Sequence, residues 1–193
     1  MSSSTAYDIG AVDLSDDRYT VEQHSIRNKY EAMDAEGNTV LRGKHEMFKV
    51  KDEFPFTDPD GNEAFTIKAS GVMDIAGDYL LTDGQTGDEL VILDNDFSIL
   101  QDTWTIRDAD DRSVLAEITS RGAVITLARQ FLPFGEWIPH KYEIVDETGA
   151  HVGQIDGQFS LKDRYEISID DASSVPKEPI VAGAMVIDAI QGN

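Results

Sequence analysis

The sequence of 193 residues contains no cysteine. Disulfide bonds and thiolate metal sites are therefore excluded, because both need the cysteine sulfur. The sequence also lacks a run of eighteen apolar residues, which excludes a membrane-spanning helix. Its first residues have neither the basic start nor the apolar core of a signal peptide. These absences together predict a cytoplasmic protein without disulfides.

Basic residues are scarce, with 16 lysines and arginines against 37 acidic residues and a net charge of −21. The acidic residues are spread along the whole chain rather than gathered in a tail. Dispersed acid of this kind is typical of adaptation to molar salt, where the Debye length falls to about 3 Å. The other interpretation is an acidic protein that binds a basic partner. Both interpretations disfavour binding to nucleic acid or to an anionic membrane through charge.

Catalytic and metal-binding patterns are also missing from the sequence. It contains no phosphate-cradling glycine loop and no constellation for nucleophilic or acid–base catalysis. The histidines lack the spacing of a metal-binding element; they are His24, His45, His140 and His151. We therefore expect no cofactor, no metal and no enzymatic activity.

Three short acidic segments are predicted to be turns. The segment Asp58–Glu63 resembles half of a calcium loop, but its glycine stands fourth rather than sixth and no bidentate glutamate follows at position twelve. Its Asp-Pro-Asp-Gly core is a strong turn signal. The segments Asp94–Asp96 and Asp108–Asp111 are likewise predicted to be turns.

The most informative segment is the stretch from Ile180 to Ile190, in which nine of eleven residues are apolar and only Gly183 and Asp188 are not. A helix that is apolar all round must be enclosed by protein or lipid. Its length of roughly 20 Å is too short for a hydrocarbon core of ~30 Å. The sequence therefore predicts a C-terminal helix enclosed by the rest of the chain.

Short strands separated by acidic turns are predicted from about Arg18 to Asp171. One cassette recurs: an aromatic residue, alternating residues, an aspartate, a turn and a return strand. It begins at Lys29 and again at Tyr79, Trp104 and Tyr142. Strands every 8–12 residues with Asp/Gly turns predict antiparallel hairpins. Further strands are predicted at Met47–Lys51, Ala64–Ala69, Asp96–Leu100, Gln158–Lys162 and Tyr165–Asp170.

The strand number and the apolar helix point to one architecture. An eight-stranded barrel is filled by its own side chains, whereas an eleven-stranded barrel encloses a helix. We therefore predict a mainly β fold: a closed antiparallel barrel of about twelve strands around a buried C-terminal hydrophobic helix. Residues 1–17 are predicted to be a flexible N-terminal segment, and residues 18–193 a single domain.

Two features are candidate sites. The segment from Ser120 to Phe134 has helical spacing and is predicted to cap one mouth of the barrel. Its aromatic end is either a lid on the core or an exposed patch for a ligand or lipid, formed by Phe131, Leu132, Phe134 and Trp137. Asp188 is a buried acid that either lies in a ligand cavity or, as we prefer, fixes the register of the helix through hydrogen bonds.

The order of these elements resembles a known family. Hairpins at Tyr30–Gly37, Trp104–Asp111 and Tyr142–Gly149 are followed by the strand Tyr165–Ile169 and a helix from Ala182 to Ile190. From Val21 to Gln191 the sequence resembles the LURP-one-related family, which shares the tubby C-terminal-like fold with phospholipid scramblases. The resemblance implies a twelve-stranded barrel around a central hydrophobic helix.

What the resemblance implies for function is limited. Plant members of the family are associated with defence, and tubby-type relatives bind phosphoinositides through clustered basic residues. In this sequence the comparable residues are scattered among acids, namely Lys44, Lys49, Lys51 and Lys68. We expect a monomeric, non-enzymatic binding or scaffold module whose protein or lipid partner is unknown. The alternative is lipid or small-ligand binding through Phe131–Trp137.

Overall fold

The computed structural model describes residues 12–24, 29–44, 53–69, 78–97, 102–120, 141–158, 164–173 and 175–191. Side chains of residues 95–97, 102, 158 and 188–191 are outside the description. The described residues form twelve strands and one helix: β1 Arg18–His24, β2 Lys29–Met33, β3 Thr39–Lys44, β4 Glu53–Thr57, β5 Glu63–Ala69, β6 Tyr79–Asp83, β7 Glu89–Phe97, β8 Asp102–Asp108, β9 Val114–Ser120, β10 Lys141–Asp146, β11 His151–Gln158, β12 Arg164–Ile169 and α2 Lys177–Gln191.

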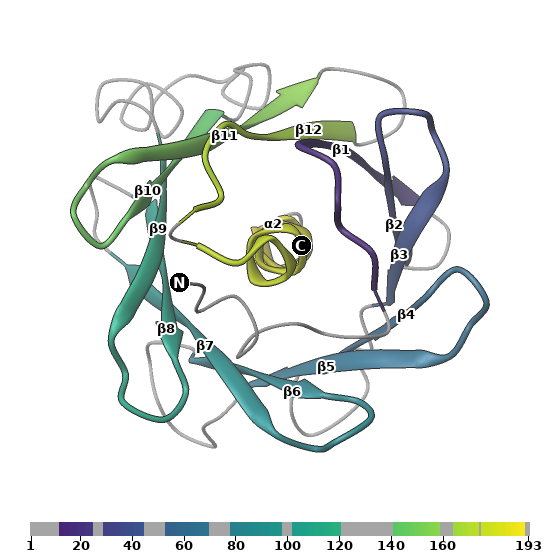
Figure 1. Ribbon diagram of the computed structural model, residues 1–193, viewed down its shortest axis with the longest axis horizontal. Helices are drawn as coiled ribbons and strands as arrows, with labels where there is room; N and C mark the ends of the chain where they lie inside the picture. The colour runs from purple at the N-terminus through teal and green to yellow at the C-terminus, as the bar shows by residue number, and fades with distance from the viewer. Residues whose placement is uncertain are drawn as a thin grey trace.

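Each strand pairs antiparallel with its neighbour in the chain, and β1 pairs with β12 to close the barrel. Helix α2 lies along the middle of the ring of strands, as Figure 1 shows end-on. Closure gives every described strand a partner on both sides, although β3 and β4 meet through only two residue pairs. The predicted fold class, a closed barrel around a C-terminal helix, is confirmed.

Helix α2 begins with Pro179 in its first turn, where a missing N–H is tolerated. Its residues from Ile180 to Ile187 are all buried. At Gly183, an added Cβ would lie 3.4 Å from the Cδ2 atom of Leu93 on β7. A Cβ at this position would be in ordinary van der Waals contact with β7. The prediction that the helix has no solvent-facing side is confirmed over these described residues.

The even-numbered strands repeat one inward pattern at every second residue. An aromatic residue is followed two positions later by an apolar residue and, two positions after that, by an aspartate in five of the six strands. The aromatic positions are Tyr30, Phe54, Tyr79, Trp104, Tyr142 and Tyr165, each at most 8% exposed. The aspartates are Asp34, Asp58, Asp83, Asp108 and Asp146. In β12 the final position is Ile169 instead.

This repeat places residues of the same type at the same level along the barrel axis. The six aromatic residues lie near the start of their strands, and the aspartates lie at the opposite end, where each hairpin turns. Because successive strands run antiparallel, all five aspartate turns stand at one end of the barrel. We call this end the aspartate rim. The cassette predicted from the sequence is confirmed, and a further copy, Phe54–Asp58, was missed.

One predicted turn is wrong. The segment Asp94–Asp96 lies inside β7 and pairs with Thr105, Trp104 and Thr103 of β8. The carboxylate of Asp94 accepts a hydrogen bond from Nε of Arg107 at 3.0 Å. The Asp94 carboxylate therefore finds its partner on the neighbouring strand β8, and the segment stays extended.

Several predicted elements lie partly or wholly outside the described residues. These are the strand Met47–Lys51, most of Asp96–Leu100 and of Gln158–Lys162, and the helix Ser120–Phe134 apart from Ser120, which ends β9. The strand Ala64–Ala69 is confirmed within β5, and Tyr165–Asp170 is confirmed within one residue by β12. Val12 and Leu14, which precede β1, belong to the hydrophobic core. The tightly packed part of the chain therefore begins before Arg18.

Candidate functional site at the aspartate rim

The residues predicted as a ligand or lipid contact, Phe131, Leu132, Phe134 and Trp137, lie outside the described residues. Asp188 lies in α2, but its side chain is likewise outside the description. These two sites therefore stay predictions. The described residues place polar and charged groups in three regions: the barrel interior, the aspartate rim and the outer surface.

The described interior is almost entirely apolar. Of the buried polar side chains, Asp83 and Ser120 lie on the inward face of their strands, whereas Thr66 and Thr105 lie on the outward face. Asp83 accepts hydrogen bonds from the backbone amides of Gln85 and Thr86 at 2.7 and 2.8 Å, so its carboxylate closes the turn between β6 and β7. Within this part of the chain, no acid, base and nucleophile converge as catalysis would require.

The indole of Trp104 carries a buried polar atom in the interior. The Nε1–H group of Trp104, which is 1% exposed, finds no acceptor among the described residues. Its ring packs beside Tyr79 with centroids 6.1 Å apart, and Tyr79 in turn meets the edge of Phe54. An unsatisfied buried donor costs about 1–3 kcal/mol. No sequence pattern predicts this unsatisfied group, because a tryptophan at this repeat position looks like the ordinary aromatic residue of its cassette.

Each turn of the aspartate rim is closed by its first residue. The Asp34 backbone N–H donates to the Asn38 carbonyl at 2.9 Å, and the Asp34 carbonyl accepts from the Gly37 amide at 3.1 Å. The same pair of bonds recurs in the four other aspartate turns. Four of the five turns place a glycine at positive φ: Gly37, Gly61, Gly87 and Gly149. In the β8–β9 turn the corresponding residue is Arg112, at φ 61°.

The aspartate side chains lock these turns further. Asp34 accepts hydrogen bonds from both the backbone and the side-chain amide of Asn38, at 2.7 and 2.9 Å. Asp58 binds Asn62 in the same way. The Asn side-chain amide is the main cause that lowers the pKa of each of these aspartates. The prediction that Asp58–Glu63 is a turn is confirmed.

A single lysine holds the N-terminal segment at this rim. The Nζ atom of Lys177, in the first turn of α2, donates to the Ser15 carbonyl at 3.3 Å, the Asp16 carbonyl at 2.6 Å and Oδ1 of Asp17 at 2.9 Å. The Asp16 carbonyl also accepts from the Tyr19 hydroxyl at 2.7 Å. Burial of Tyr19, helped by the charge of Asp16, raises the pKa of its phenol. Sequence reasoning missed this contact because its partners are about 160 residues apart.

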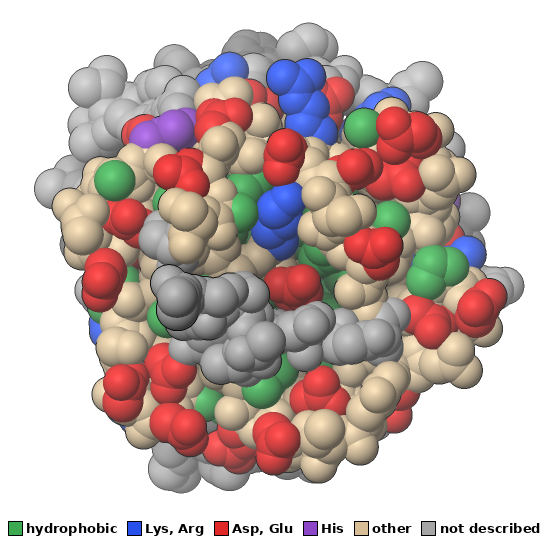
Figure 2. All heavy atoms as spheres, viewed as in Figure 1, with side chains coloured by type: hydrophobic (Ala, Val, Ile, Leu, Met, Phe, Trp, Pro, Cys, Tyr) green, Lys and Arg blue, Asp and Glu red, His purple; other side chains and the backbone are tan. Residues whose placement is uncertain are grey.

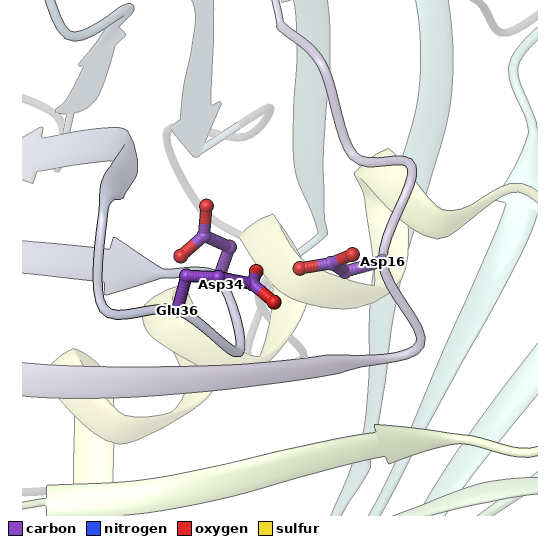
Figure 3. Close-up of side chains that lie close together, drawn as sticks. All are labelled: Asp16, Asp34 and Glu36. Carbon is purple, nitrogen blue, oxygen red and sulfur yellow. The ribbon is translucent and has the colours of Figure 1, made fainter.

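Three carboxylates meet beside that contact, as Figure 3 shows for Asp16, Asp34 and Glu36. One oxygen of each lies within 4.8 Å of the others. Hard cations accept such oxygen ligands. Two of the three carboxylates already have partners, because Asp34 binds Asn38 and Asp16 accepts from the Ala35 amide at 3.1 Å. The arrangement closes the β2–β3 turn against the N-terminal segment.

His151, Glu143 and Asp170 form a charged cluster on the outer surface. The ring of His151 on β11 meets Glu143 Oε1 at 3.2 Å and Asp170 Oδ2 at 3.0 Å. Hydrogen bonding to Asp170, followed by that to Glu143, raises the pKa of His151, although slight burial acts the other way. The same bond lowers the pKa of Asp170.

The face in Figure 2 carries acidic side chains on all sides and few basic ones. No helix among the described residues is long and apolar enough to cross a membrane.

Comparison with known proteins agrees with this architecture. The structure is similar to the X-ray structure of an Arabidopsis thaliana protein, with a TM-score of 0.61 and 13% sequence identity, over 97% of this chain and 99% of the plant chain. That likeness concerns the fold alone. A search of curated proteins finds no match. The family model described as LURP-one-related matches residues 39–188, from β3 into α2. Since this match covers most of the barrel and its helix, the chain belongs to the LURP-one-related family.

Proposed function

We propose that this protein is a non-enzymatic binding or scaffold module whose partner contacts the outside of the barrel. The observation that carries the proposal is the filling of the described interior by α2. Met185 of the helix is 1% exposed, and its Cε atom would lie 3.3 Å from a Cβ added at Gly43 of β3. A packed core of this kind offers a ligand no room, so recognition falls to the surface.

The aspartate rim suits such recognition. Its turns are held by paired backbone bonds and aspartate side chains, on a closed wall. Loops that a rigid scaffold holds in place commonly carry binding function. At low ionic strength, the net charge of −21 favours a basic partner. In molar salt this attraction is screened, so the partner would have to bind through contacts that salt does not weaken.

We also propose that the protein is cytoplasmic, monomeric and salt-adapted. It would share the tubby C-terminal-like fold and bind no nucleic acid. Dispersed acid supports the salt adaptation, and the net charge of −21 disfavours binding to nucleic acid.

Affinity capture from cytosol of the source cells, at low salt and in molar KCl, tests the binding role. The rim variant is Asp110→Lys with Glu147→Lys, and the matched wall variant is Glu117→Lys with Glu166→Lys. We expect one reproducible partner with wild type and the wall variant, and its loss with the rim variant. Recovery of nothing at any salt concentration contradicts the binding role, and equal loss in both variants contradicts its placement at the rim.

The second candidate function is lipid or small-ligand binding through Phe131–Trp137. The aromatic density of this segment supports it. Flotation with liposomes of neutral and anionic lipid, at several salt concentrations, compares wild type with Phe131→Ser plus Phe134→Ser. Flotation of wild type alone favours this function. Absence of flotation for both proteins rejects it.

A further inference from the structure

We propose that residues 12–17 form a strap that locks α2 into the barrel, with Lys177 as its latch, and that this strap opens as a unit while the wall stays closed. The strap is the segment before β1; in Figure 1 its purple trace lies inside the ring of strands, near α2. This inference goes beyond the proposed binding role and does not depend on it.

Lys177 uses all of its side-chain hydrogen-bond donors in the strap. A lysine ammonium group has three N–H donors, and the Nζ atom of Lys177 has three acceptors in the strap: two carbonyls and one carboxylate. Its side chain is only 17% exposed, so these bonds are partly shielded from water. By contrast, Lys68 and Lys141 form single ion pairs on the outer wall, and their side chains are 55% and 54% exposed.

The position of Lys177 makes those acceptors necessary. It is the first residue of α2, where the helix dipole disfavours a positive charge. The strap carbonyls, in turn, belong to no strand and need donors. Lysine and strap therefore supply partners for each other, although the Asp16 carbonyl also accepts from the Tyr19 hydroxyl.

Further contacts attach the strap to the wall. Asp16 accepts from the Ala35 amide in the β2–β3 turn, and Asp17 accepts from the Ile169 amide at the end of β12 at 2.8 Å. Val12 and Leu14 are 7% and 5% exposed. The strap thus joins β2–β3, β12 and α2 at one mouth of the barrel.

The strap has fewer restraints than the wall. Each strand pairs with a neighbour on both sides, although β3 and β4 share only two residue pairs, whereas the strap makes only the few bonds described above. Segments with few contacts open locally at lower free energy than the core they cover. Opening would expose Val12, Leu14 and the start of α2 without breaking the barrel ladder.

Hydrogen exchange of the full chain tests this. In Lys177→Gln we expect the exchange rates of the Ile169 and Ala35 amides to rise about tenfold or more, while those of Ile106 and Ile118 in β8 and β9 stay unchanged. Leu14→Ser, made in the strap itself, should give the same pattern. Lys68→Gln and Lys141→Gln, which remove the same charge, should give no local change, and Lys177→Arg should restore part of the protection.

Native-state exchange of wild type at increasing urea below the unfolding transition gives a second readout that needs no variant. The Ile169 and Ala35 amides should open at lower urea than the Ile106 and Ile118 amides. If all four amides open together, or if both strap variants leave Ile169 and Ala35 as protected as in wild type, the strap is not a separate unit and the inference is wrong.

Discussion

Gly153 on β11 lies so close to Ser168 on β12 that an added Cβ would stand 2.1 Å from the Ser168 carbonyl oxygen. The obstacle is backbone, so no side-chain rotation can relieve it. Next to this contact, the Val152 carbonyl accepts from the amides of both Asp170 and Asp171, at 2.7 and 3.0 Å. The close approach of β11 and β12 therefore depends on the absence of a side chain at Gly153.

Gly153→Ala should lower the free energy of unfolding by about 3 kcal/mol, the upper range for overpacking a tight site. Urea denaturation followed by circular dichroism measures it. Gly149→Ala is the matched control: it lies at φ 81° with nothing within 4 Å of its Cβ, so it should cost only about 1–2 kcal/mol for the left-handed conformation. Equal effects of the two substitutions would contradict the contact.

Arg112→Gly should stabilise the protein. Arg112 adopts φ 61° in the β8–β9 turn, where the other aspartate turns have glycine. The left-handed conformation costs a non-glycine residue about 1–2 kcal/mol. Glycine removes this cost, but its greater freedom in the unfolded chain offsets part of the gain in stability. We expect the free energy of unfolding of Arg112→Gly, measured by urea denaturation, to exceed that of Arg112→Ala by about 0.5–1 kcal/mol. Both variants lose the same charge, so a lower stability for glycine would mean that the turn is not strained.

Gly183→Ala should be neutral or stabilising by up to about 1 kcal/mol, because alanine has the higher helix propensity. Its Cβ would meet Leu93 at 3.4 Å, which is ordinary contact. Gly183→Leu should destabilise the barrel by roughly 3 kcal/mol, since the wall leaves no volume for it. Thermal unfolding of the two variants measures the contrast. Full tolerance of leucine would show that space remains beside the helix.

The pair of His151 and Asp170 should make stability depend on pH. The raised pKa of His151 adds stability below its ordinary value of 6.5, which is lost as pH rises through the folded pKa. The lowered pKa of Asp170 adds stability above its ordinary value of 3.8, which is lost as pH falls through the folded pKa. The pair should therefore contribute most between about pH 3.8 and pH 6.5.

Urea midpoints of wild type and His151→Gln at pH 5.5 and pH 8.5 measure this contribution. The difference between the two proteins should be larger at pH 5.5. An NMR titration should place the His151 pKa above 6.5 in wild type and closer to 6.5 in Asp170→Asn. A difference that grows toward pH 8.5 would contradict the ion pair.

Salt should stabilise the protein strongly. At a net charge of −21 the folded chain repels itself, and molar salt reduces the Debye length to about 3 Å. The melting temperature should rise between 0.1 M and 3 M KCl. Asp110→Lys with Glu147→Lys changes the charge from −21 to −17, since each substitution adds two units, and should flatten the rise. An unchanged slope would mean that salt acts mainly through apolar burial.

The repeat could be predicted from the sequence because strand periodicity is local. Tyr142, Ile144 and Asp146 alternate within one strand, so two-residue spacing alone marks their common face. The copy at Phe54–Asp58 has the same spacing, but Pro55 obscured it, since proline argues against a strand interior. Asp94 was wrongly assigned to a turn because its partner, Arg107, stands thirteen residues away on another strand.

The sequence by itself determined the closed barrel and its enclosed helix, because an apolar segment of this length must be covered and the strand repeat supplies the cover. Only the tertiary structure decided the contact of Lys177 with the strap and the close approach at Gly153. Lys177 binds the strap across about 160 residues, and Gly153 is required by a carbonyl on the neighbouring strand. Such contacts depend on the three-dimensional path of the backbone, which local periodicity does not encode.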